Sequence, residues 1–213
     1  MNLVLFGPPG AGKGTQSQLI AEKFHLTHVS TGDLLRAAIK AQTPLGLEAK
    51  KYLDSGVLVS DSIVVGLIQE VMKVQKKAGM LLDGFPRTTA QAESLDLLLK
   101  NENAQVNRAI FLEVPRELLK SRLTGRRICS SCGATFHTIL KPSKNAGICD
   151  LCQGKLEQRP DDKEEVIDTR LEVYEKSTAP LKSYFQKAQK FVNVDGVGEP
   201  NSVFDRICSA VKS

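Results

Sequence analysis

The residues from Gly7 to Lys13, GPPGAGK, have types and spacing suited to holding a phosphate. They follow the apolar run Asn2–Phe6 and lead into a helical pattern from Lys13 to Phe24. In a strand–loop–helix setting, backbone N–H groups converge on a phosphate at the positive end of the helix, and the lysine reaches the β and γ phosphates. The alternative is a glycine-rich turn without a ligand. We therefore predict a binding loop for a nucleoside triphosphate, formed by Gly10, Ala11, Gly12, Lys13, Gly14 and Thr15.

The loop departs from the general pattern at the position where a hydroxyl would bind Mg²⁺. Gly14 follows the lysine, and the hydroxyl arrives one place later at Thr15. The metal is then expected to be held by phosphate oxygens and water, with a carboxylate at the end of a neighbouring strand. Asp83, directly after the apolar run Met80–Leu82, is the candidate. Its alternative role is to cap the turn before Gly84.

A second group of residues is suited to binding a metal. Two C-x-x-C pairs, separated by sixteen residues, are formed by Cys129, Cys132, Cys149 and Cys152. This spacing predicts a zinc ribbon, and four thiolates leave zinc no open position, so the site would be structural. His137 lies between the pairs but is not needed as a ligand, and it could instead line the edge of a nucleotide site.

The rest of the chain must position these groups. Further apolar runs at 109–112 and 191–194 alternate with helical stretches such as Asp61–Gln75, which predicts a parallel sheet covered on both faces. The segment from Ser30 to Val59 is predicted to form short helices, with breaks at Pro44, Gly46 and Gly56. His25 and His28 flank a short predicted strand and are expected to be surface or packing residues.

Composition limits the class of protein. The 213 residues are 41% hydrophobic and carry a net charge of +5, which fits one globular core with inserted segments and an affinity for anions. No run approaches the roughly 18 apolar residues of a membrane span, and the N-terminus lacks a signal-peptide pattern, so we expect a cytoplasmic protein without a membrane partner. Five arginines cluster around the cysteine segment, namely Arg122, Arg126, Arg127, Arg159 and Arg170.

Several motifs together resemble the adenylate kinases. They are the loop GPPGAGKGT, STGDLLR at Ser30–Arg36, LLDGFPRT at Leu81–Thr88, and the later RLTGRR and RPDD. The resemblance covers essentially the whole chain, and the cysteine segment looks like the lid of the zinc-bearing, long-lid members. It implies an α/β fold, a P-loop parallel sheet flanked by helices with an inserted helical monophosphate-binding segment and a zinc-ribbon lid. The expected divisions are core at 1–29, 60–125 and 163–213, AMP-binding insertion at 30–59 and lid at 126–162.

The resemblance also implies an activity, the reversible transfer of a phosphoryl group from Mg-ATP to AMP to give two ADP, with structural Zn²⁺ in the lid. The single core and the short segments that flank the lid predict a monomer. The resemblance implies an AMP site made of Thr31, Arg36, Gly84, Arg87, Gln91, Arg159 and Arg170. Beyond the loop, it implies ATP contacts from Arg122, Arg126, Phe136 and His137. Catalytic roles fall to Lys13, Asp83, Arg87, Arg126, Arg159 and Arg170, while Asp161 and Asp162 help to hold the closed lid.

The chemical requirements of phosphoryl transfer support this interpretation independently of the family resemblance. Two nucleotides brought together set like charges against each other, and arginine forks supply the compensating charge. A phosphate acceptor is largely ionised at neutral pH, so no general base is required. In the relatives a tyrosine often precedes the lid histidine, where this chain has Phe136, so any hydrogen bond from that hydroxyl is lost.

Two other functions compete with this one. A pyrimidine or GTP-dependent nucleoside monophosphate kinase is the nearest, but Thr31 and the long lid favour AMP. A nucleic-acid-binding ATPase with a zinc ribbon comes from a different class. The ribbon has no aromatic platform beyond Phe136 and few basic runs, so we expect no nucleic-acid partner.

Overall fold

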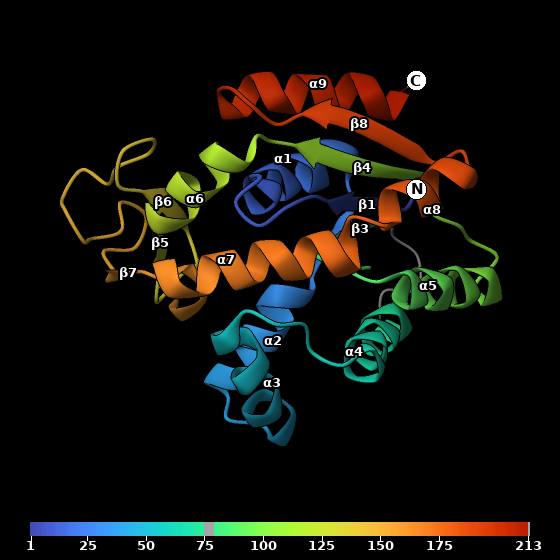
Figure 1. The fold of residues 1–213 in the computed structure, drawn as a ribbon, viewed down its shortest axis with the longest axis horizontal. Helices are drawn as coiled ribbons and strands as arrows, with labels where there is room; N and C mark the ends of the chain where they lie inside the picture. The colour runs from blue at the N-terminus through green and yellow to red at the C-terminus, as the bar shows by residue number, and fades with distance from the viewer. Residues whose placement is uncertain (75–78, 213) are drawn as a thin grey trace.

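The computed structural model describes residues 1–74 and 79–212, and a five-stranded parallel sheet lies at its centre (Figure 1). The strand order is β2-β3-β1-β4-β8. The strands are β1 Leu3–Phe6, β2 Thr27–Ser30, β3 Met80–Asp83, β4 Arg108–Glu113 and β8 Phe191–Asp195. The predicted α/β fold with a parallel sheet is confirmed.

The apolar strands bury both faces of the sheet, as their nearly continuous hydrophobic runs require. Side chains alternate across a strand, so Leu3 and Leu5 of β1 join one core cluster while Val4 and Phe6 join the other. All four are at most 2% exposed. The sheet is therefore fixed from both sides, and its carboxyl edge is a rigid platform for the loops that follow β1 and β3.

Helices cover the two faces. Their bounds are α1 Lys13–Phe24, α4 Asp61–Val74, α5 Thr89–Asn101, α6 Arg116–Thr124, α7 Glu164–Val173, α8 Leu181–Lys187 and α9 Pro200–Lys212. The helix predicted over 61–75 begins at Asp61, and its expected last residue, Gln75, lies outside the described residues. Within residues 1–74 and 79–212, no helix combines the length and apolarity needed to cross a membrane.

The segment that follows β2 forms two helices, α2 Thr31–Lys40 and α3 Pro44–Ser55. Pro44 begins α3 behind the capping hydroxyl of Thr43, and Gly56 ends it with a φ of 75°. The prediction of a break at Gly46 was wrong, because Gly46 lies inside α3. A Cβ at Gly46 would meet the carbonyl oxygen of Ala38 at 2.1 Å, so this glycine lets α3 pack closely against α2.

A small antiparallel sheet forms within the ribbon segment (residues 126–162), in the strand order β6-β5-β7. The strands are β5 Arg126–Cys129, β6 Thr135–His137 and β7 Leu156–Glu157, and a 3₁₀ turn, η1, follows at Pro160–Asp162. Figure 1 shows this sheet and its loops at one end of the molecule, beside α6 and the start of α7. Its described core consists of Cys129, Phe136, Cys149 and Leu156, which is small for an independently stable unit.

Candidate functional site

The glycine-rich loop connects β1 to α1, as predicted. Gly12 caps the helix with a φ of 96°, a left-handed conformation that favours glycine. Lys13 folds back over the loop, and its Nζ donates to the carbonyl oxygens of Gly7 at 2.8 Å and Pro8 at 3.0 Å. The backbone of the loop and the lysine therefore surround a space at the N-terminus of α1 where a phosphate can bind.

Asp83 ends β3 beside this loop, because parallel pairing sets Leu5 of β1 opposite Asp83. Its Oδ2 accepts a hydrogen bond of 3.0 Å from the hydroxyl of Ser17 and lies 3.4 Å from Nε2 of His28. The sequence did not indicate either partner. Ser17 is one turn after Lys13 on α1, and His28 lies within β2, where the prediction of a surface or packing residue missed its contact with the carboxylate.

The Lys13 amine is held in an environment that disfavours its charge. Its pKa is lowered to about 7, mainly by burial; the charge of Asp83 opposes this shift, and the charges of Arg87, Arg170 and Arg126 add to it. A bound triphosphate brings negative charge to the amine and therefore raises this pKa again. Binding then takes up a proton at pH values between the pKa of Lys13 in the free protein and its raised pKa in the complex.

We expect ATP binding to the protein at pH 8 to take up a proton, since Lys13 is mostly neutral before binding and charged afterwards. Linkage requires the affinity to fall as pH rises above about 7, by at most about tenfold per pH unit. Calorimetry in two buffers of different ionisation enthalpy measures the uptake. Lys13→Met should abolish it, and equal heats in both buffers for the unchanged protein would contradict the assignment.

One cleft joins most of the predicted site residues. It runs from the loop to Arg36 on α2 in one direction, and to Arg122, Phe136 and His137 in the other. Between these two arms it is lined by Asp83, Gly84, Arg87, Arg126, Arg159 and Arg170. Thr31 and Gln91 do not line this cleft. The arrangement offers two arms that meet over the phosphate loop, with cations at the junction.

Two of the arginines are fixed by Asp162, which is completely buried. Arg126 binds its carboxylate through two parallel hydrogen bonds of 2.7 and 2.5 Å, and Arg170 adds a third of 2.7 Å. Arg170 also pairs with Asp161 at 3.1 Å. Because the planar guanidinium presents its donors as a fork, this pairing sets the direction in which each arginine faces the cleft.

The positive charges of Arg87 and Arg159 are less well compensated by carboxylates than those of Arg126 and Arg170. Burial lowers the pKa of Arg159 to about 9, helped by the like charges of Arg126 and Arg36, and lowers that of Arg87 to about 10, helped by Arg170. Both stay charged at neutral pH. Within the described part of the chain, Nε of Arg159 is buried without a hydrogen-bond partner. An anion placed between these groups would relieve their mutual repulsion.

The side chains expected to select adenine are engaged within the protein. The hydroxyl of Thr31 donates to the carbonyl oxygen of Gly84 at 2.8 Å. The amide of Gln91 donates to Asp61 at 2.7 Å and accepts from the backbone N–H of Arg87 at 2.7 Å. One N–H and one lone pair of this amide remain for a ligand. Asp61 was not indicated by the sequence as a partner, because thirty positions separate it from Gln91.

His137 connects the ribbon segment to α6. Its Nδ1 accepts from the backbone N–H groups of Ile139 and Leu140, both at 3.0 Å, so the ring proton resides on Nε2, which lies 3.3 Å from the carbonyl oxygen of Ser121. Arg122 is held nearby by the carbonyl oxygen of Gly196 at 3.2 Å. These contacts shape the arm of the cleft that lies farthest from Arg36.

Gly125→Ala is expected to disturb this arm selectively. A Cβ at Gly125 would lie 2.3 Å from the imidazole of His137 and would displace it from Ser121. We expect KM for ATP to rise several-fold while KM for AMP changes less than twofold. Steady-state kinetics with each substrate varied in turn measures the difference, and an equal change in both constants would show that the contact has no such selectivity.

The model of one protein family, described as adenylate kinase, matches residues 5–190. The chain belongs to the adenylate kinase family. It is 51% identical to the adenylate kinase of Carboxydothermus hydrogenoformans over 213 residues, covering 100% of both chains. It is 50% identical to that of Syntrophobacter fumaroxidans over 208 residues, 97% of this chain and 98% of the relative. The adenylate kinase of Clostridium tetani is 47% identical over 212 residues, 99% of this chain and 98% of the relative. The family predicted from the motifs is confirmed.

The four cysteines of the chain lie together, with all Sγ atoms within 4.8 Å of one another. Sγ–Sγ distances of 3.4 Å (Cys129–Cys152) and 3.6 Å (Cys132–Cys149) are close to those in a tetrahedral zinc–thiolate site. Backbone N–H groups of Cys132 and Leu151 point to the sulfurs of Cys129 and Cys149. The N–H of Cys132 is the main cause that lowers the pKa of Cys129, whereas the pKa of the neighbouring Cys152 is raised. A bound metal would stabilise the thiolate form of all four cysteines. The cluster fits zinc.

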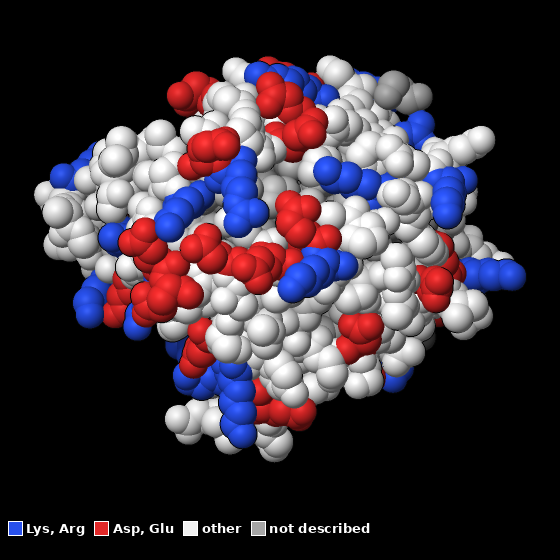
Figure 2. Space-filling view, viewed as in Figure 1, with Lys and Arg blue, Asp and Glu red and all other residues white. Residues whose placement is uncertain are grey.

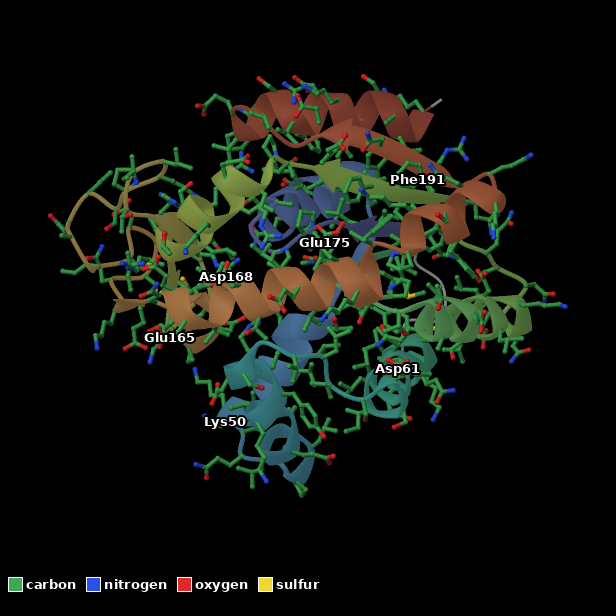
Figure 3. The ribbon with its side chains drawn as sticks, viewed as in Figure 1. Lys50, Asp61, Glu165, Asp168, Glu175 and Phe191 are labelled. Atoms are coloured by element: carbon green, nitrogen blue, oxygen red, sulfur yellow. The ribbon has the colours of Figure 1, made fainter. Side chains whose placement is uncertain are left out.

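The charged side chains that line the cleft are mainly positive, whereas the outer surface of the neighbouring helix α7 is acidic. Arg170 lies on the inner side of α7, whereas Glu165 and Asp168 of α7, and Glu175 of the π-helical turn that follows it, lie on the outer side (Figure 3). Figure 2 shows acidic side chains gathered along this outer surface. Anionic ligands are therefore repelled by the exterior of α7 and attracted by the cations within the cleft.

Proposed function

We propose that the protein transfers the γ-phosphoryl group of Mg-ATP to AMP, giving two ADP, and that the reaction is reversible. The cleft supports this proposal most directly, because its two arms meet at a junction where Lys13, Arg87, Arg126, Arg159 and Arg170 gather. Phosphoryl transfer depends mainly on positioning and on cations aimed at the moving charge. The family to which the chain belongs acts on the same substrates.

The proposed roles follow the two arms. ATP would place its phosphates on the loop from Gly10 to Thr15 and its base beside Arg122, Phe136 and His137. AMP would place its phosphate against Arg36 and Arg87, with Gly84 beside it. Thr31 and Gln91 are buried and do not line the cleft, so they would come into contact with the base only as AMP enters. The arginines at 126, 159 and 170 would stabilise the charge on the phosphoryl group as it moves from one arm to the other.

The carboxylates of the cleft also have proposed roles. Asp83 would hold the Mg²⁺ that accompanies ATP, through water or directly, since it ends a strand beside the phosphate loop. The hydroxyl of Ser17 would keep its carboxylate oriented. Asp162 is fully engaged by two arginines and would keep them in place. An acceptor phosphate is already ionised at neutral pH, so none of these carboxylates has to act as a general base.

The ribbon segment (residues 126–162) is proposed to be a lid that closes over the cleft and excludes water from the transfer. A contact between Lys40 on α2 and the carbonyl oxygen of Ser130, at 3.5 Å, supports an approach of the segment to the helices at 30–59. The lid would hinge near Gly125 and Pro160. Zinc bound by the four cysteines would hold the lid together without entering the chemistry.

We also propose that the protein acts as a monomer, since one chain supplies every residue assigned to the cleft. Its four closely spaced thiols fit the cytoplasm, where thiols stay reduced and available to a metal.

The test of this function compares AMP with adenosine as the acceptor. Both carry the same base, but only AMP brings an ionised phosphate to the arginines. We expect ADP to form rapidly from Mg-ATP and AMP, and adenosine to be phosphorylated at least about a thousandfold more slowly. Comparable rates with adenosine would require a general base that this account does not contain, and would refute it.

A further inference from the structure

Three atoms of Arg87 are held by hydrogen bonds from the protein. Its backbone N–H donates to Gln91 Oε1 at 2.7 Å, and its Nε donates to the carbonyl oxygen of Gly84 at 2.8 Å. Its own carbonyl oxygen accepts a hydrogen bond of 2.8 Å from the hydroxyl of Thr178. The first two partners are close neighbours along the chain, whereas Thr178 is 91 positions away. Thr178 therefore ties the loop that carries Arg87 to a distant helix.

That helix is α7, and a single π-helical turn, η2 Tyr174–Thr178, continues it. The backbone N–H of Ala179 donates to Tyr174 at 2.9 Å, five residues back, which is the bond that defines such a turn. Along an uninterrupted α-helix, residue 178 would lie about 80° around the axis from residue 170. The extra residue of the π turn reduces this offset to about 20° in the opposite sense, so Thr178 and Arg170 share a face.

Both residues on this face contribute to the junction of the cleft. Arg170 reaches Asp161 and Asp162, while Thr178, only 6% exposed, reaches the Arg87 backbone. The like charges of Arg36 and Arg170 repel the guanidinium of Arg87. If the loop that carries Arg87 were mobile, this repulsion would move Arg87 away from Arg36 and Arg170. The hydrogen bond from Thr178 opposes this displacement at the main chain.

A second set of contacts, made by Asp61, restrains the same loop. Asp61, at the start of α4 (Figure 3), accepts from the amide of Gln91 at 2.7 Å and from the hydroxyl of Thr88 at 3.0 Å. The amide of Gln91 is thereby oriented so that its oxygen receives the backbone N–H of Arg87. The N–H and the carbonyl of Arg87 are thus anchored to separate helical segments.

We propose that Thr178 is a positioning residue for phosphoryl transfer, which acts by holding the main chain of Arg87 so that its guanidinium faces the phosphate of the acceptor. This inference rests on the proposed function of the cleft. It assigns a role to the π turn, a rare geometry often found at functional sites. Thr178 itself touches neither nucleotide in this account.

Thr178→Val tests the proposal, because valine keeps the shape of threonine and removes the hydroxyl. We expect kcat/KM for AMP to fall about fivefold, the effect of losing one hydrogen bond between uncharged groups, while KM for ATP stays within twofold. Thr178→Ser keeps a hydroxyl and should restore most of the activity. Ser209→Ala is the matched control, since it removes a 3.0 Å hydroxyl–carbonyl bond on α9, away from the cleft.

A double-mutant cycle with Arg87→Ala separates positioning from a merely structural role. If Thr178 acts through the guanidinium, valine at 178 should change kcat/KM by less than twofold once Arg87 is alanine. The same fivefold loss in both backgrounds would overturn the proposal, as would unchanged kinetics of Thr178→Val. Thermal melts confirm that each variant is folded at the assay temperature, and Thr178→Ala replaces valine if that variant does not fold. Failure of the unchanged protein to phosphorylate AMP would instead refute the proposed function.

Discussion

Arg170→Ala is expected to lower kcat about a thousandfold, because an arginine aimed at a transferring phosphoryl group contributes on this scale. Arg170 extends from the inner side of α7 into the junction of the cleft, where Asp161 and Asp162 fix its direction at 3.1 and 2.7 Å. Stopped-flow or coupled assays of ADP formation measure the change. Arg170→Lys should recover only part of the loss, because lysine keeps the charge but lacks the planar fork.

The matched control for this prediction is Arg206→Ala on α9. Arg206 also pairs with an aspartate, Asp195 at 3.3 Å, but both side chains are exposed, and Arg206 is not among the arginines proposed to act in phosphoryl transfer. Its substitution should leave kcat within twofold. A loss of less than tenfold for Arg170→Ala, in a protein that melts like the original, would remove Arg170 from the catalytic assignment.

Removal of zinc from the ribbon segment is expected to unfold that segment while the central sheet stays folded. The segment buries few apolar side chains, and its four cysteines would supply through the metal the stability that its core lacks. Scanning calorimetry should show a separate transition at lower temperature after chelation. Phosphoryl transfer should fall with it, since Arg126 and Arg159 belong to the same segment.

Cysteine variants distinguish metal loss from general damage. Cys132→Ser removes one ligand of the cluster and should behave like the chelated protein. Cys208→Ser changes the one cysteine outside the cluster, on α9, and should melt like the original. An unchanged melting profile after the metal has been removed, with its absence verified by elemental analysis, would contradict a structural role for zinc.

Local patterns predicted much of the fold. Three features could be predicted because each depends on residues only a few positions apart: the loop after β1, Asp83 at the end of β3, and the cysteine pairs. The small sheet of the ribbon segment was not predicted, because β7 has only two residues and carries no periodicity. A helix break was predicted at Gly46 because glycine is common at helix ends. In the structure Gly46 lies within α3, where the absence of a side chain allows α2 to pack closely.

The parts of the site that could not be predicted depend on contacts between distant segments. Ser17 and Asp83 meet across 66 positions, and Thr178 meets Arg87 across 91. In the sequence, nothing distinguishes Ser17 or Thr178 from the many serines and threonines that lie on a protein surface and contact only water. The link from Asp61 to Gln91 likewise requires α4 and α5 to be placed side by side. These partners follow from the packed fold and not from any motif.

The most direct test of the central claim offers the protein Mg-ATP with AMP, CMP or UMP in separate reactions, with water alone as the control, and follows the diphosphates formed. We predict rapid turnover with AMP only, with two ADP formed for each ATP consumed. Turnover with CMP or UMP at a similar rate would contradict the assignment of Thr31 and Gln91 to adenine selection. Hydrolysis of ATP without transfer to any monophosphate would contradict the function itself.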